Sequence, residues 1–118
     1  IVHLSDPVFD ELNALAGPAQ HALVFTTTGT TPVSGFSKAK ARLDQISGVR
    51  NWRLHDVRRS LATVATEELG FEPVVVDRIL NHVNGSVKGI AAVYQKGQYL
   101  EKRKTVLDVW AEYIQTPT

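Results

Sequence analysis

The stretch "LHDVRRSLATVATEELG", residues 54–70, predicts the most regular helix of this chain. Its apolar or small side chains recur at the spacing of one helix face, at Val57, Leu61 and Ala65. Gly70 follows where such a helix would end. The first turn also holds a histidine and two arginines. The same stretch therefore sets the fold and raises a question of function, because those cations suit either an ordinary charged helix start or a bound phosphate.

The rest of the chain is also predicted to be mostly helical. Only residues 21–28, "HALVFTTT", have the short apolar run that is typical of a strand. Leu107, Trp110 and Ile114 are expected to form the apolar face of an amphipathic last helix, which is compatible with docking in cis or in trans. The other predicted helices cover residues 4–17, 36–47, 71–82, 86–96 and 99–114. We expect a mainly α fold with at most a short strand or residual β-hairpin.

Composition limits the possible classes. A chain of 118 residues that is 43% hydrophobic suits one domain over residues 1–118. We expect a soluble intracellular protein, because no apolar run approaches membrane-spanning length and the start does not resemble a signal peptide. The absence of Cys excludes disulfides and thiolate sites, and the absence of Met suggests a piece of a longer protein. Lys and Arg total 13 against 12 acidic residues, so any phosphate site must be local.

His55 and Arg58 are three residues apart and so share one helix face. Asp56 can cap this helix, whose unpaired first-turn N–H groups favour an anion. Arg58 is expected at the edge of the core, with Arg59 nearer to solvent. A half-buried guanidinium needs a partner, which is either an internal carboxylate such as Asp77 or Glu68, or a bound phosphate.

Other candidates are weaker one by one. Lys38, Lys40 and Arg42 form either a solvated charged face or contacts to a nucleic-acid backbone. His82 suits a helix C-terminal cap, and Tyr94 a half-buried side chain with its hydroxyl at the surface.

In order, "HDVRRS", "LNHVNGS" and "VYQK" resemble the C-terminal catalytic domain of the tyrosine recombinases, the phage-integrase family. The last predicted helix, "YLEKRKTVLDVWAEYI", looks like the end of prophage integrases. His55 and Arg58 match the family's His-x-x-Arg motif, His82 matches a later His/Trp position, and Tyr94 matches the nucleophile.

The resemblance implies site-specific DNA recombination and integration through a 3′-phosphotyrosine. Arg58 would stabilise charge on the phosphate, His55 would donate to the phosphate or take the tyrosine proton, and His82 would add a donor. Arg59, Lys38 and Lys40 would contact DNA. The implied partners are double-stranded DNA attachment sites and other protomers of a tetramer, in the cytoplasm of a bacterial host, with no metal or cofactor required.

Two departures from the family pattern matter. Nothing in this chain matches the family's first catalytic arginine or its hairpin lysine, so we expect a fragment of the catalytic domain that is inactive alone. The interval of 12 positions between His82 and Tyr94 is longer than in many members, which leaves Tyr99 as a second candidate nucleophile.

Four other hypotheses stay open on the sequence. One is a non-enzymatic DNA-binding module built from helices 55–69 and 73–81, and another is a protein-interaction domain in which Arg58 is paired internally. A metal site from His55, Asp77 and His82 lacks a recognised ligand spacing. A type IB topoisomerase would share the phosphotyrosine chemistry.

Overall fold

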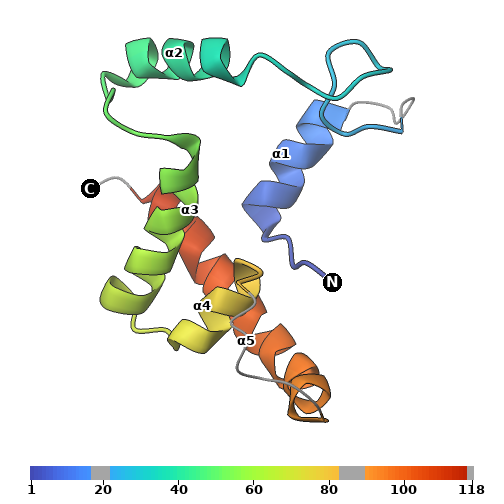
Figure 1. The fold of residues 1–118 in the computed structure, drawn as a ribbon, viewed down its shortest axis with the longest axis vertical. Helices are drawn as coiled ribbons and strands as arrows, with labels where there is room; N and C mark the ends of the chain where they lie inside the picture. Colours follow the sequence, from blue (N-terminus) through green and yellow to red (C-terminus); the bar gives the residue numbers. More distant parts are fainter. Residues whose placement is uncertain (17–21, 83–89, 117–118) are drawn as a thin grey trace.

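A computed structural model describes residues 1–16, 22–82 and 90–116, with the backbone alone for Ala16 and residues 90–98. This part of the chain is helical and holds no strand, which confirms the mainly α prediction (Figure 1). Its elements are α1 (Asp6–Ala16), α2 (Phe36–Ser47), α3 (Leu54–Thr63), the π-helix η1 (Val64–Glu68), α4 (Pro73–Ile79) and α5 (Ile90–Gln115).

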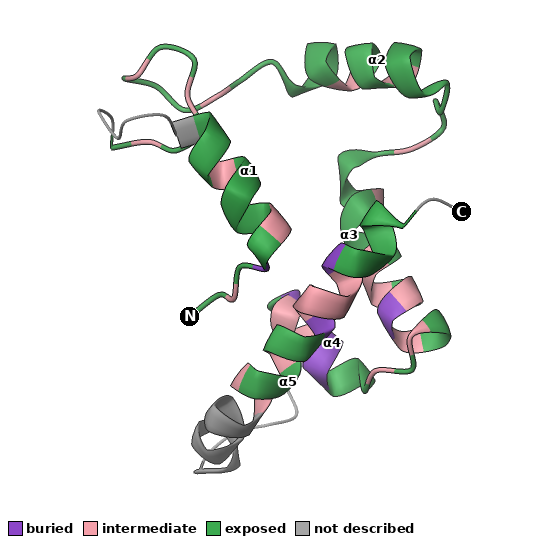
Figure 2. Ribbon diagram, turned by 180° about the vertical axis from the view of Figure 1, so that it is seen from behind, coloured by how far each residue is buried: buried purple, intermediate pink, exposed green. Residues whose placement is uncertain are grey.

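The core lies where η1, α4 and α5 meet (Figure 2). Ala65 is fully buried at the end of the α3–η1 helix, and α4 contributes two buried valines. The buried members of this cluster are Ala65, Val75, Val76, Leu80 and Val106.

The α5 face that enters the core differs from the predicted one. Val106 and Ala111 are the buried residues, whereas Ile114 is 60% exposed. The predicted residues Leu107 and Trp110 are intermediate. At about 3.6 residues per turn, Val106 and Ala111 lie on opposite sides of the face formed by Leu107, Trp110 and Ile114, so the two edges of that face are buried more fully than its middle.

The helix predicted over residues 55–69 forms, with a change of winding near its end. After Thr63 the backbone continues as one π-helical turn, in which Leu69 N–H donates to Val64 O at 2.9 Å. Gly70 then adopts φ +71°, the left-handed conformation that lets Phe71 N–H reach Ala65 O at 2.9 Å. The predicted role of Gly70 as the helix end is confirmed.

α1 and α2 lie outside this core. α1 packs against α5 through the N-terminal segment, where His3 Nε2 lies 2.7 Å from Asp108 Oδ1 and Arg103 Nη2 donates to Ile1 O at 3.0 Å. α2 extends away from the other helices in Figure 1, and none of its residues, all of which the structure describes, is buried. Within the described residues, no helix is both long and apolar enough to cross a membrane.

The prediction of a strand over residues 21–28 is wrong for the described residues 22–28, which form bends. A strand is stable only when its backbone pairs with another strand, and here a single backbone hydrogen bond, from Val33 N–H to Phe25 O, joins this segment to the residues after it. Hydrogen bonds from a side chain to the nearby backbone replace strand pairing here. Thr26 Oγ1 accepts from Gly29 N–H at 2.9 Å and donates to Thr31 O.

The helices predicted over residues 86–96 and 99–114 are one helix from residue 90 onward. α5 continues through Gly97 without a break, so Tyr99 lies inside a helix and does not begin one. An interior glycine costs a helix only about 1 kcal/mol, which the packing of the rest of α5 can offset.

Candidate nucleic-acid interface

The N-terminus of α3 is capped by a backbone hydrogen bond and by the Asp56 carboxylate. Arg53 N–H donates to Asp56 Oδ2 at 2.9 Å, and Asp56 N–H donates to Arg53 O at the same distance. The carboxylate thus satisfies one N–H group at the positive end of the helix dipole. The predicted capping role of Asp56 is confirmed.

His55 and Arg58 are both exposed. The prediction that Arg58 lies at the edge of the core is therefore wrong. The first turns of α3 extend beyond the other helices, and burial of this helix face begins further on: Val57 is 60% exposed, whereas Ala65 is fully buried.

The carboxylates considered as partners for Arg58 have other partners. Asp77 pairs with His82, and Glu68 Oε2 accepts from Tyr113 Oη at 2.8 Å. In the part of the chain that the structure describes, Arg58 makes no ion pair. Its exposed side chain is therefore not held by any carboxylate of the described residues.

His82 lies just after α4 and is held by Asp77 from the same helix. Its Nδ1 lies 3.2 Å from Asp77 Oδ1, and its backbone N–H donates to Asp77 O at 2.9 Å. Because an ionised carboxylate can only accept, Nδ1 carries the proton in this contact, which leaves Nε2 for another partner.

The two candidate tyrosines both lie on α5, one described by its backbone and the other with its side chain. Tyr94 is placed within α5 by its backbone, and its side chain lies outside the described part of the structure. Tyr99 is partly buried and packs against the core cluster. The described part of the structure therefore does not place the side chains of His55, Arg58, His82 and Tyr94 together in one site.

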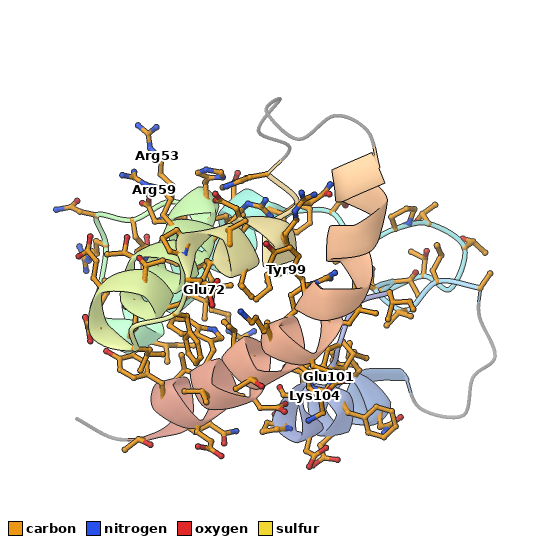
Figure 3. All side chains as sticks on the ribbon, turned by 90° about the horizontal axis from the view of Figure 1, so that it is seen from below. Arg53, Arg59, Glu72, Tyr99, Glu101 and Lys104 are labelled. Atoms are coloured by element: carbon orange, nitrogen blue, oxygen red, sulfur yellow. The ribbon has the colours of Figure 1, made fainter. Side chains whose placement is uncertain are left out.

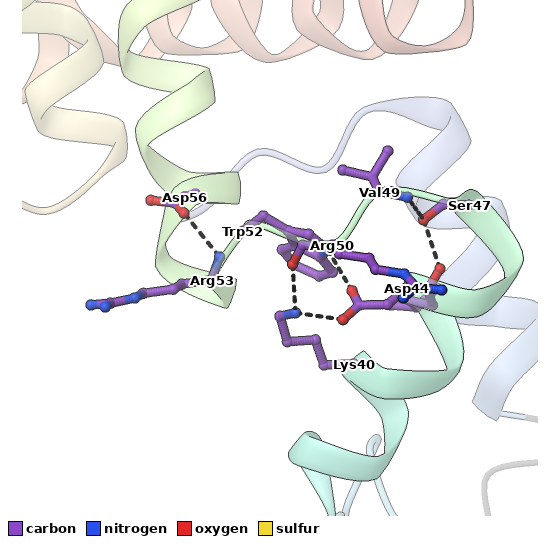
Figure 4. Close-up of polar contacts among 9 residues, drawn as sticks. Lys40, Asp44, Ser47, Val49, Arg50, Trp52, Arg53 and Asp56 are labelled. Carbon is purple, nitrogen blue, oxygen red and sulfur yellow. Dashed lines mark hydrogen bonds and ion pairs between the residues drawn. The ribbon is translucent and has the colours of Figure 1, made fainter.

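A polar cluster of Lys40, Asp44 and Trp52 joins α2 to the segment that leads into α3 (Figure 4). Asp44 accepts from Lys40 Nζ and from Trp52 Nε1, each at 2.8 Å. Lys40 Nζ lies 4.8 Å from the centre of the Trp52 ring and also donates to Arg50 O at 3.3 Å. The ammonium of Lys40 and the indole N–H together hold the pKa of Asp44 below its ordinary value.

Basic residues are concentrated on α2, on this connecting segment and on the start of α3. Seven of the 13 Lys and Arg residues lie between residues 38 and 59, with only two carboxylates, Asp44 and Asp56. Both carboxylates are already engaged, one in the polar cluster and one at the helix start. The seven are Lys38, Lys40, Arg42, Arg50, Arg53, Arg58 and Arg59, all exposed except the intermediate Lys40.

Arg53 and Arg59 project outward together from α3, whereas Glu101 and Lys104 lie at the opposite end of the view in Figure 3. The Arg59 side chain is 73% exposed, and its contact with Asp56 is long, at 3.5 Å. Such an exposed pair contributes little and leaves Arg59 available to another anion.

Sequence reasoning missed Arg50 and Arg53 as members of this basic surface. The near-zero net charge of the whole chain concealed it, since the remaining charged residues are predominantly acidic. A charge count over a short window would have found it. His55, Asp77 and His82 do not form a metal-binding group, because no three His, Asp or Glu residues of the described chain are gathered closely enough.

Comparison with known proteins gives one partial match to a curated protein. The chain is 34% identical over 56 residues to prophage integrase IntA of Escherichia coli (strain K12). The matched region covers 48% of this chain and 13% of that integrase. No protein-family model and no solved structure matches the chain. The chain thus has an integrase-like relationship over about half its length.

Proposed function

We propose that residues 1–118 belong to the C-terminal part of an integrase catalytic domain, which cleaves and rejoins DNA through a 3′-phosphotyrosine at Tyr94. The observation that carries this proposal is the concentration of exposed cations around His55 and Arg58. A DNA duplex presents a dense row of phosphates, so a surface with unneutralised cations suits it. The partial similarity to a prophage integrase supports the same function.

The chemistry assigns each residue one task. The Tyr94 hydroxyl attacks phosphorus and gives up its proton, and the bond from phosphorus to the 5′ oxygen breaks. That oxygen takes up a proton from solvent, so that the released strand leaves as a 5′-hydroxyl. Arg58 donates two charge-assisted hydrogen bonds to the non-bridging oxygens as their charge grows. His55 accepts the tyrosine proton or binds the same phosphate, and His82 donates through Nε2 when both of its ring nitrogens are protonated. Reversal by another strand's 5′-hydroxyl completes the exchange.

The partners follow from this chemistry. Double-stranded attachment sites are the substrate, and strand exchange between two duplexes requires further protomers, in a tetramer on DNA. Lys38, Arg53 and Arg59 contact the sugar–phosphate backbone and so set position, without reading the sequence.

A DNA-binding module without catalysis is the alternative, and α4 is the reason we rank it second. In a helix-turn-helix the second helix presents polar side chains to a DNA groove. Here Val75 and Val76 of α4 are 2% exposed and form part of the core. α4 has only seven residues, so it offers little surface for reading bases.

The test is to trap the protein on a nicked suicide duplex, using the full-length protein. Tyr94→Phe should abolish the covalent adduct. Tyr99→Phe is the matched control and should retain it, because the Tyr99 ring packs against the core and phenylalanine preserves that ring. An adduct that survives Tyr94→Phe contradicts the assignment. Residues 1–118 alone should bind duplex DNA without forming the adduct, since the family's first arginine and its lysine have no counterpart here.

A further inference from the structure

The connection between α2 and α3 depends on polar contacts, because α2 contributes nothing to the core. None of its 12 residues is buried. The described contacts between this helix and the segment that leads into α3 come from the cluster of Lys40, Asp44 and Trp52 and from the turn beside it. This cluster therefore determines how α2 is oriented relative to α3.

The cluster is better sheltered than an ordinary surface ion pair. The Lys40 and Asp44 side chains are 26% and 21% exposed, and both carboxylate oxygens of Asp44 are occupied. The Trp52 ring covers the ammonium on one side. Two interactions thus meet on the Asp44 carboxylate, an ion pair with Lys40 and a charge-assisted hydrogen bond from the Trp52 indole, and a cation–π contact joins Lys40 to Trp52 beside them.

The turn after α2 is shaped to fit the cluster. Gly48 takes φ +73° and donates its N–H to Asp44 O at 3.0 Å, while Ser47 Oγ accepts from Val49 N–H at 3.2 Å. Trp52 N–H then donates to Arg50 O at 2.9 Å, one residue before the chain enters the α3 cap at Arg53. Of residues 48–53, which join the two helices, all except Asn51 take part in one of these contacts or in the α3 cap.

The cluster lies between two groups of exposed cations. Lys38 and Arg42 belong to α2, and Arg53, Arg58 and Arg59 lie at the start of α3. For both groups to contact one phosphate backbone, the angle between the two helices has to be held fixed. Lys40 differs from its neighbours because its ammonium is already engaged.

We propose that Lys40, Asp44 and Trp52 form a positioning element that holds the cations of α2 and α3 in one phosphate-binding surface for duplex DNA. This inference rests on the proposed function. In this arrangement Lys40 supports the surface, and the cations on either side of the cluster contact the phosphates directly. Asp44 thereby strengthens binding to a polyanion although its own charge repels phosphate.

The experiment is a salt titration of duplex binding by the chain of residues 1–118. Each lost phosphate contact lowers the slope of log affinity against log salt concentration by about 0.9. Asp44→Asn weakens the hold on Lys40, and Trp52→Phe removes the indole donor without changing charge. Both variants should bind duplex DNA more weakly. The slope of log affinity against log salt concentration should fall by up to about two units, because Lys38 and Arg42 would each lose one phosphate contact.

Asp10→Asn is the matched control, because Asp10 is an exposed residue of α1 and the change in charge is the same. It should bind slightly more tightly with an unchanged slope, as simple repulsion predicts. If Asp44→Asn behaves like Asp10→Asn, the positioning role is wrong while the proposed function stands. A wild-type chain that binds no duplex overturns both.

Discussion

At the scale of single residues, Arg58 combines a central predicted role with an exposed position. It lies on the first turns of α3 and makes no ion pair with the described residues. A positive charge at this exposed site therefore serves no visible packing purpose. This separates its effect on chemistry from its effect on folding.

Arg58→Ala should leave the folding free energy within about 0.5 kcal/mol of wild type, as for other exposed sites without special contacts. In the full-length protein it should slow adduct formation about 100- to 1,000-fold, the usual cost of removing one donor to a transition-state oxyanion. Thermal unfolding and trapping on the suicide duplex measure the two effects. Arg59→Ala is the control: it removes only a proposed contact to the sugar–phosphate backbone and should retain adduct formation at saturating DNA. Strong destabilisation by Arg58→Ala would instead favour the protein-interaction hypothesis, in which this arginine is paired internally.

Asp108 gives the N-terminal segment a pH-dependent attachment to α5. Lys104 and, to a smaller extent, His3 lower the pKa of this carboxyl from its ordinary value of 3.8. A lowered pKa in the folded state stabilises the fold above the ordinary value, and this stabilisation is lost as pH falls through the folded-state pKa. Acid should therefore release the His3 contact.

Asp108→Asn should remove that part of the acid sensitivity. We expect the variant to lose less stability than wild type between neutral pH and pH values below the ordinary aspartate pKa, measured by chemical unfolding at several pH values. Glu112→Gln, on the same helix and exposed, is the control. Equal acid sensitivity of wild type and Asp108→Asn would contradict the assigned cause.

At the scale of elements, the difference in side-chain burial between α4 and α2 indicates which helix stabilises the fold. Leu80 at the end of α4 is 4% exposed, whereas Leu43 of α2 is 50% exposed. Leu80→Ala should cost about 2–5 kcal/mol, because it leaves a cavity in the core. Leu43→Ala is the same chemical change and should cost less than about 0.5 kcal/mol. Chemical denaturation of both variants measures the difference, and similar losses would mean that α2 is packed after all.

Gly70 ends the π-helical turn with a positive φ that a Cβ disfavours, although there is open space around it. Gly70→Ala should therefore destabilise the fold by about 1–2 kcal/mol through backbone strain. Gly70→Asn should recover part of the loss, because asparagine enters this conformation more readily. Unfolding by urea compares the three proteins, and an alanine variant as stable as wild type would show that the turn relaxes.

These elements show what the sequence can predict. The helix over 36–47 and the Gly70 end depend on local patterns, and the structure confirms both. The strand prediction at 21–28 failed because pairing depends on a partner that no local pattern reveals. The predicted half-burial of Arg58 failed for a similar reason, since its exposure depends on where α4 and α5 end relative to α3. Asp56 was predicted correctly because helix capping is local.

At the scale of the whole molecule, the chain is less compact than its length suggests. Its radius of gyration is 17.0 Å, against about 13.5 Å for a compact chain of this size. α2 and the segment around it account for this, since Phe36, Leu43 and Ile46 are each at least half exposed. Stability is therefore concentrated in one part of the structure.

Native-state hydrogen exchange should reveal this uneven distribution. Amides of α4 and of α5 around Val106 should exchange only through global unfolding, because they surround the buried cluster. Amides of α2 should exchange by local opening at a much lower free energy, because only the Lys40, Asp44 and Trp52 contacts and its own hydrogen bonds hold them.

Leu80→Ala distinguishes local from global opening within this experiment. It should reduce the protection of α4 and α5 by its full effect on stability and leave the α2 amides unchanged, since α2 shares no buried side chain with that core. Trp52→Phe should reduce the protection of the α2 amides and leave that of the α4 and α5 amides unchanged. Binding of duplex DNA should then protect α2 far more than the α5 amides around Val106, because the phosphate-binding surface spans α2 and α3 and Val106 lies in the core. Equal protection throughout the chain would contradict both the separate stability of α2 and its place in the DNA-binding surface.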